Sequence, residues 1–163
     1  MSVDRTHAWG FTLFADDLRV EVGGKISLMG IYQNDLIVTA DELPVVMSKL
    51  ILMVKYYEIA NQVSGDVKFV VNFPEHAGTK VPPLERVIRR AEFPKIAEEL
   101  RSDEGDLPFV HLSIPFILSP FPIVAEGNIR VRCHFEDGSV LKLGRLNLII
   151  RKPPEGVISK KKE

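Results

Sequence analysis

Apolar and polar residues alternate most regularly between positions 127 and 150, and this pattern predicts a β-hairpin. The apolar positions of its first half are Ile129, Val131, Cys133 and Phe135, with polar residues between them. A repeat of two residues is typical of a strand that is buried on one face only. Asp137-Gly138 then favours a tight turn, because glycine adopts a positive φ without steric cost. The apolar run from Val140 to Ile150 predicts the returning strand.

The returning strand changes its apolar phase in the middle. Its apolar residues lie at odd positions before Gly144 and at even positions after it: Leu141 and Leu143, then Leu146, Leu148 and Ile150. One extra residue would keep both halves facing the same core. The sequence therefore predicts a β-bulge at Gly144, where glycine accepts the bulged conformation most readily.

Strand-like patterns also occupy most of the chain before this hairpin. The segments are 9–15, 17–22, 26–32, 45–57, 67–73 and 107–119. A three-residue loop after Val22 would pair Val20 with Leu28, so that apolar residues face each other across the first hairpin. Both faces of 45–57 are apolar, which predicts a central strand, whereas Pro115 predicts an edge position for 107–119.

The spacing changes between residues 84 and 101, where a short helical insertion is expected. Its apolar residues, Leu84, Val87, Ile88 and Ala91, have helical spacing, and Pro83 precedes them as at a helix start. A strand is the alternative that this pattern leaves open.

Together these elements predict a mainly β protein, built as a two-layer antiparallel β-sandwich of about seven to eight strands. Immunoglobulin-like and C2-like arrangements both fit. The chain has 163 residues, of which 45% are hydrophobic, and this suits one domain. We expect this domain to span 1–152, with the lysine-rich 153–163 as a flexible tail.

The first predicted hairpin resembles the opening signature of a family of small uncharacterised bacterial β-sandwich proteins, a domain of unknown function. The matching pattern is Asp17-x-Arg19-x-Glu21-x-x-Gly24-Lys25-x-Ser27-Leu28-x-Gly30-x-Tyr32. The closing part is also similar to that family: Phe121-Pro122, Gly127, an alternating strand and Asp137-Gly138. Ile129 departs from the family pattern, where an aromatic residue is expected, and 82–106 matches nothing in it. The resemblance implies a fold and no activity.

Charge and composition predict a cytoplasmic protein without nucleic-acid or membrane partners. The formal net charge is -1, so no overall positive field exists to attract nucleic acid. No apolar run has the length of a membrane span or of a signal peptide. The single cysteine, Cys133, lies on the apolar face of its strand and cannot form an internal disulfide, which favours a reducing compartment.

No motif for catalysis, metal or cofactor binding is recognisable. The sequence therefore favours a protein that is not an enzyme, but it does not exclude an enzyme. The four histidines, His7, His76, His111 and His134, are too scattered to suggest a zinc site. Gly24-Lys25 lacks the remainder of a phosphate-binding loop. The chain also has no Gly-x-Ser-x-Gly elbow.

Two candidate sites are left. The first is a partner-binding patch of Ile117, Phe121 and Ile123, in a segment with more apolar residues than one strand face can bury. The alternative is that the helical insertion covers them. The second is an anion site of Arg86, Arg89 and Arg90, together with Arg130 and Arg132. Its alternative is an outer face of salt bridges with nearby glutamates.

The preferred functional hypothesis is a non-catalytic protein-interaction or assembly module, with a protein partner or a second copy of itself. The rival hypothesis is a domain that binds an anionic small molecule, or an enzyme, with Arg86 and Arg90 contacting the anion.

Overall fold

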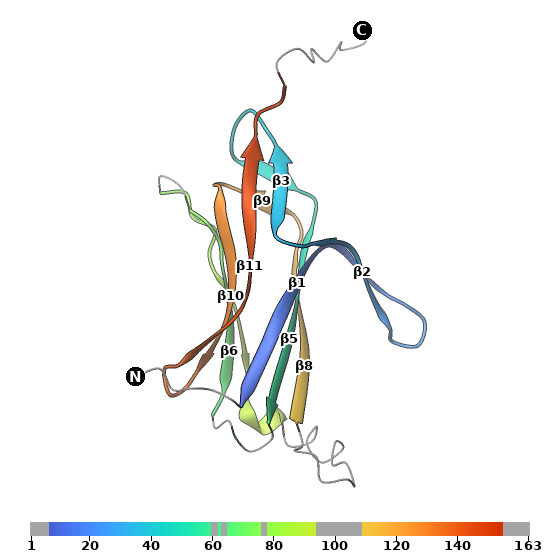
Figure 1. The fold of residues 1–163 in the computed structure, drawn as a ribbon, viewed down its shortest axis with the longest axis vertical. Helices are drawn as coiled ribbons and strands as arrows, with labels where there is room; N and C mark the ends of the chain where they lie inside the picture. The colour runs from blue at the N-terminus through green and yellow to red at the C-terminus, as the bar shows by residue number, and fades with distance from the viewer. Residues whose placement is uncertain (1–6, 60–61, 63–64, 76–77, 94–108, 155–163) are drawn as a thin grey trace.

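In the computed structural model, two β-sheets pack face to face as a β-sandwich, as predicted (Figure 1). The structure describes residues 7–59, 62, 65–75, 78–93 and 109–154. Within these ranges the chain forms eleven strands, more than the seven to eight expected. No helix in the described ranges is long and apolar enough to cross a membrane.

The first sheet has four antiparallel strands. Their order is β2 (Ile26–Tyr32), β1 (Ala8–Val20), β5 (Leu50–Ile59) and β8 (Phe109–Leu118). The central position of β5 is confirmed, and so is the edge position of β8, which contains Pro115. A proline is tolerated there because an edge strand leaves half of its backbone groups outside the ladder.

The second sheet has five strands. Their order is β3 (Asp35–Thr39), β11 (Val140–Arg151), β10 (Gly127–Phe135), β6 (Val67–Asn72) and β7 (Leu84–Ile88). The expectation of a wholly antiparallel sandwich is wrong at one place, because β3 pairs with β11 in parallel. A small third sheet pairs β4 (Val45–Met47) with β9 (Phe121–Ile123).

The expected helix around 84–101 is also wrong over the residues that the structure describes. Leu84–Ile88 forms strand β7, antiparallel to β6, and only the 3-10 turn η1 (Arg90–Glu92) follows. Leu84 and Ile88 are four residues apart, a spacing that places them on one face of a helix and equally on one face of a strand. Pairing with β6 decides between the two. Residues 94–101 lie outside the described ranges.

The hairpin of β10 and β11 has the predicted turn and bulge. Its two strands pair up to His134 opposite Val140, and Gly138 has a φ of 83° in the turn between them. The register shifts at Val131, which pairs with Gly144, so that Leu143 is the extra residue. Leu143 packs over Gly10 of β1, where a Cβ would approach the leucine Cδ2 to 2.7 Å. The bulge therefore lies where the second sheet crosses the first.

The first hairpin extends beyond the sandwich. β1 pairs with β5 only as far as Ala15, and its remaining residues pair with β2 alone, forming the arm visible in Figure 1. The loop has the predicted three residues, but it is closed by Glu21 and Lys25, so the predicted register is wrong by two positions. Val20 therefore pairs with Ile26 instead of Leu28. A shift of two leaves each side chain on its expected face.

The core fills the space between the two sheets. Cys133 is fully buried there, as predicted, beside other side chains that are less than 2% exposed, including Tyr56, Phe69, Ile129 and Leu146. The inner face of β1 is unexpected. Trp9 and Phe11 point outward and are 46% and 47% exposed, while the smaller Ala8 and Gly10 lie on the inner side of the strand.

Candidate functional sites: an apolar sheet face and a basic groove

The predicted partner patch is only partly exposed. Phe121 and Ile123 are each 1% exposed, so the expectation that they meet a partner is wrong. They belong to β9, which pairs with β4 and directs both side chains into the core, where Phe121 lies 5.6 Å from Phe73 between ring centroids. Ile117 of β8 points outward and is 57% exposed, as predicted.

Ile117 belongs to a larger apolar surface on the outer side of the first sheet. Six of its side chains are between 44% and 57% exposed: Trp9, Phe11, Met29, Ile31, Phe109 and Ile117. They come from β1, β2 and β8, and we call them, together with Tyr57 of β5, the apolar face. Where β1, β5 and β8 pair, Lys55 is the one formal charge among the described residues that point outward.

Aromatic rings form a row across the apolar face. Trp9 and Tyr57 stack with 5.6 Å between centroids and 6° between planes, and Tyr57 stacks on His111 at 4.6 Å and 13°. Phe109 lies tilted beside Trp9 and Tyr57. Both faces of the central Tyr57 ring are therefore occupied. This geometry suits protein side chains that pack edge to face better than a sugar or a base that stacks on an open ring.

A small polar cluster lies within the apolar face. The Lys55 ammonium donates a hydrogen bond to Ser113 Oγ at 2.7 Å, and that hydroxyl lies 3.2 Å from His111 Nε2. Partial burial, and next the positive charge of Lys55, lower the pKa of His111. The cluster thus favours the uncharged form of His111 and gives Lys55 a partner inside an otherwise apolar surface.

The predicted anion site is not assembled as the sequence suggested. Arg86 lies on the edge strand β7 opposite Phe69, Arg89 is exposed beyond that strand, and Arg90 lies in η1, so they share no helical face. Arg90 is already bound within the protein. Its guanidinium pairs with the carboxylate of Glu58, donates from Nε to the Gly65 carbonyl at 2.9 Å, and lies 4.1 Å from the centroid of the Phe93 ring.

Glu58 explains why Arg90 is held in this way. Its side chain is 0% exposed, at the end of the inner face of β5. The Tyr56 hydroxyl donates a second hydrogen bond to Glu58 Oε2 at 2.6 Å. Burial, and next the adjacent carboxylate, raise the pKa of Tyr56 and keep it protonated as a donor. Arg90 is therefore a structural counterion for a buried charge.

The polar residues of the first hairpin also have structural partners. Ser27 Oγ donates to Glu21, and the Tyr32 hydroxyl donates to Asp16. Asp17 accepts a hydrogen bond from Lys49 at 2.7 Å, which lowers the pKa of Asp17. These contacts hold the arm together and attach it to the segment before β5.

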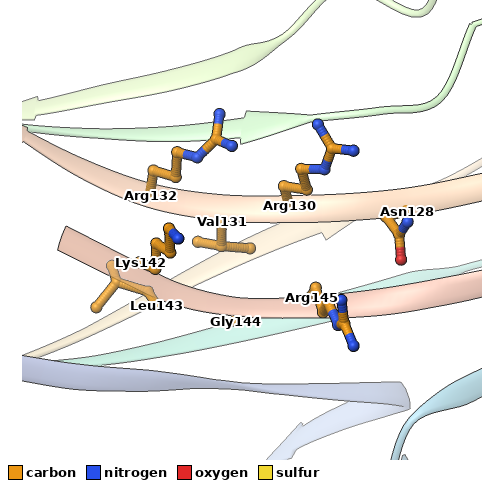
Figure 2. A pocket seen from close by; sticks show the side chains of 8 residues that line it. All are labelled: Asn128, Arg130, Val131, Arg132, Lys142, Leu143, Gly144 and Arg145. Carbon is orange, nitrogen blue, oxygen red and sulfur yellow. The ribbon is translucent and has the colours of Figure 1, made fainter. Parts of the chain in front are cut away.

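A basic groove lies on the outer side of the second sheet, between β10 and β11 (Figure 2). Its volume is about 460 Å³, and its charged lining consists of Arg130, Arg132, Lys142 and Arg145. Within the described ranges, none of these four cations has a carboxylate within 4.0 Å. Arg130 and Arg132 were among the sequence candidates, whereas Lys142 and Arg145 were missed. The hairpin register would have revealed them, because it pairs Arg132 with Lys142.

A second hollow adjoins the groove on the β6 side of β10. Its volume is about 430 Å³, and it shares Asn128, Arg130 and Arg132 with the basic groove. It also contains Lys80, which forms an exposed ion pair with Glu75 at 3.7 Å. The Oδ1 atom of Asn128, where the two hollows meet, is buried and accepts no hydrogen bond in the structure.

No protein-family model and no curated protein matches this chain. The resemblance to the bacterial β-sandwich family therefore stays a prediction. The described residues contain no group of three or more His, Cys, Asp or Glu side chains placed to hold a metal ion.

Proposed function

We propose that the protein is a non-catalytic assembly module that binds a second copy of itself through the apolar face. The observation that supports this most strongly is the gathering of six half-exposed apolar side chains on one side of one sheet. Single exposed apolar residues are normal on any protein, whereas several on one face of a sheet are typical of an interaction surface.

The size of the apolar face suits a macromolecular partner. A large side chain presents about 150–250 Å² when fully exposed, so six that are half exposed present on the order of 600 Å². This lies at the upper end of the largest apolar patches on monomers, about 300–600 Å². It also approaches the roughly 800 Å² that each partner contributes to a standard interface.

The composition of the apolar face favours a second copy over an unrelated partner. Where β1, β5 and β8 pair, the described outward residues carry a single formal charge, on Lys55. Interfaces of homodimers are more apolar than those of transient complexes, and permanent ones resemble a protein core cut in half. Two such faces would pack as the inner faces of a sandwich do, about 10 Å apart.

A cytoplasmic, bacterial setting is part of this proposal. The buried thiol of Cys133 is consistent with a reducing compartment, and the resemblance noted above supports a bacterial source.

The oligomeric state of the purified protein tests the proposal. We expect sedimentation equilibrium to show a dimer, and Phe11→Ser with Ile117→Ser to shift it towards monomer while the far-UV circular dichroism stays unchanged. These two residues are half exposed, so their loss should not unfold the protein. The matched control is Val87→Ser, which replaces a residue of similar exposure, 52%, on the other sheet. A wild-type monomer at every concentration would overturn the proposal, as would a double variant that dimerises like the wild type.

A further inference from the structure

We propose that the basic groove binds a small anion that carries two or more phosphoryl groups. This inference is independent of the proposed self-association, because the groove lies on the outer side of the other sheet. The supporting observation is an arrangement of like charges that folding alone does not explain.

The cations face each other across the two strands. Arg130 lies directly opposite Arg145, and Arg132 lies directly opposite Lys142. Like charges at opposed positions of a β-ladder destabilise the pairing. Some surface cations elsewhere have acidic neighbours, as Lys68 has Glu85 at 3.4 Å and Lys49 has Asp17 at 2.7 Å. A bound anion would supply the negative charge that the groove lacks.

The four cations come from both strands that border the groove. Figure 2 shows Arg130 and Arg132 extending together towards β6, Lys142 between β10 and β11, and Arg145 on β11 extending away from β10. The two cation pairs are two residues apart along β10, a step of about 7 Å in a strand. A single small anion cannot contact both pairs equally, whereas a chain of phosphoryl groups can. Guanidinium groups also bind phosphoryl oxygens in a bidentate manner.

Size and lining favour a small molecule over nucleic acid. The volume of about 460 Å³ lies within the usual range for small-molecule sites. The lining residues include no aromatic side chain on which a base of single-stranded nucleic acid would stack. The net charge of -1 also provides no long-range attraction for a polyanion.

Asn128 can distinguish two sources of the same oligophosphate chemistry. Its buried Oδ1 lacks a donor and lies at the end of the groove. A hydroxyl or amine group attached to the phosphoryl chain, as in a nucleoside triphosphate, would supply that donor if the Asn128 amide turned its oxygen into the groove, because this atom is closed to solvent in the structure. Inorganic triphosphate would not.

Isothermal titration at low ionic strength, with inorganic triphosphate and with a nucleoside triphosphate as separate probes, tests the proposal. We expect both to bind and Arg130→Glu to weaken binding by roughly tenfold or more, the cost of losing a charge-assisted hydrogen bond. Arg130→Glu places a carboxylate opposite Arg145, so the fold should become no less stable. This separates loss of binding from loss of folding. Arg86→Glu, on the edge strand β7, is the control and should bind normally.

Tighter binding of the nucleoside triphosphate, abolished by Asn128→Ala, would support a nucleotide ligand, and equal binding would support an inorganic oligophosphate. The proposal is overturned if neither probe binds, or if Arg130→Glu binds as the wild type does. It is also overturned if only single-stranded RNA or an acidic peptide binds. The monomeric variant with Phe11→Ser and Ile117→Ser should retain binding, which separates this proposal from the proposed function.

Discussion

Removal of the Arg90 charge should be among the most destabilising single changes in this protein. Arg90→Met keeps most of the apolar stem but leaves the Glu58 carboxylate, which is 0% exposed, without its counterion. The Tyr56 hydroxyl is then the remaining described donor to that carboxylate. Breaking a buried pair from one side costs about 3–5 kcal/mol, a large part of the roughly 5–15 kcal/mol that stabilises a typical domain.

Urea unfolding followed by circular dichroism measures this loss. Glu58→Gln in the Arg90→Met background removes the stranded charge and should recover most of the stability, so the two changes should be strongly non-additive. Arg86→Met is the matched control, because Arg86 is exposed on an edge strand, and it should change stability by less than about 0.5 kcal/mol. A loss of under about 1 kcal/mol for Arg90→Met would refute the role of Arg90 as the counterion of Glu58. Arg90 would then again be a candidate for the anion site that the sequence suggested.

Three further predictions concern the core and the apolar face. Phe69→Ala should destabilise by about 3–5 kcal/mol and Lys68→Ala by less than about 1 kcal/mol in urea unfolding, and equal losses would mean that the faces of β6 are inverted. Cys133, 0% exposed, should react with a thiol reagent only after denaturation, and rapid labelling of the native protein would contradict its position. His111 has a folded pKa below its ordinary value of 6.5, so the unfolded state binds more protons and stability should fall as the pH drops below about 6.5. Urea midpoints at several pH values should show a smaller fall for His111→Asn, and an equal fall would contradict this.

Local patterns determined the parts of the fold that could be predicted. The hairpin of β10 and β11 was predictable because its turn, its alternation and its phase change all lie within 127–150. Strand β7 was not, because Leu84 and Ile88 fit a helix and a strand equally well, and only the distant β6 resolves the choice. The role of Arg90 was hidden for the same reason, since its partner Glu58 is 32 residues away.

The candidate patch shows how long-range pairing decides burial. The segment around Phe121 has more apolar residues than one strand face can bury, but β4 provides a partner strand and both apolar side chains of β9 enter the core. The apolar face could not be predicted because here long-range packing exposes side chains instead of burying them. Trp9 and Phe11 resemble core residues in sequence, but β11 crosses β1 so closely that only small residues such as Gly10 fit between the sheets. Trp9 and Phe11 therefore face outward, whereas Phe14, farther along β1, enters the core.

The two proposed sites should work independently, because they occupy opposite outer sides of one sandwich. A dimer formed through the apolar face would leave the basic groove of each copy open, with the core between the groove and the interface. Coupling between two sites is reciprocal: anion binding changes the dimer dissociation constant by the same factor by which dimerisation changes the affinity for the anion. If the groove and the interface do not influence each other, that factor is one. We therefore expect sedimentation equilibrium to give the same dissociation constant with and without saturating inorganic triphosphate. A shift of tenfold or more, equivalent to about 1.4 kcal/mol of coupling, would show that the crossing of β1 and β11 transmits binding from one face to the other.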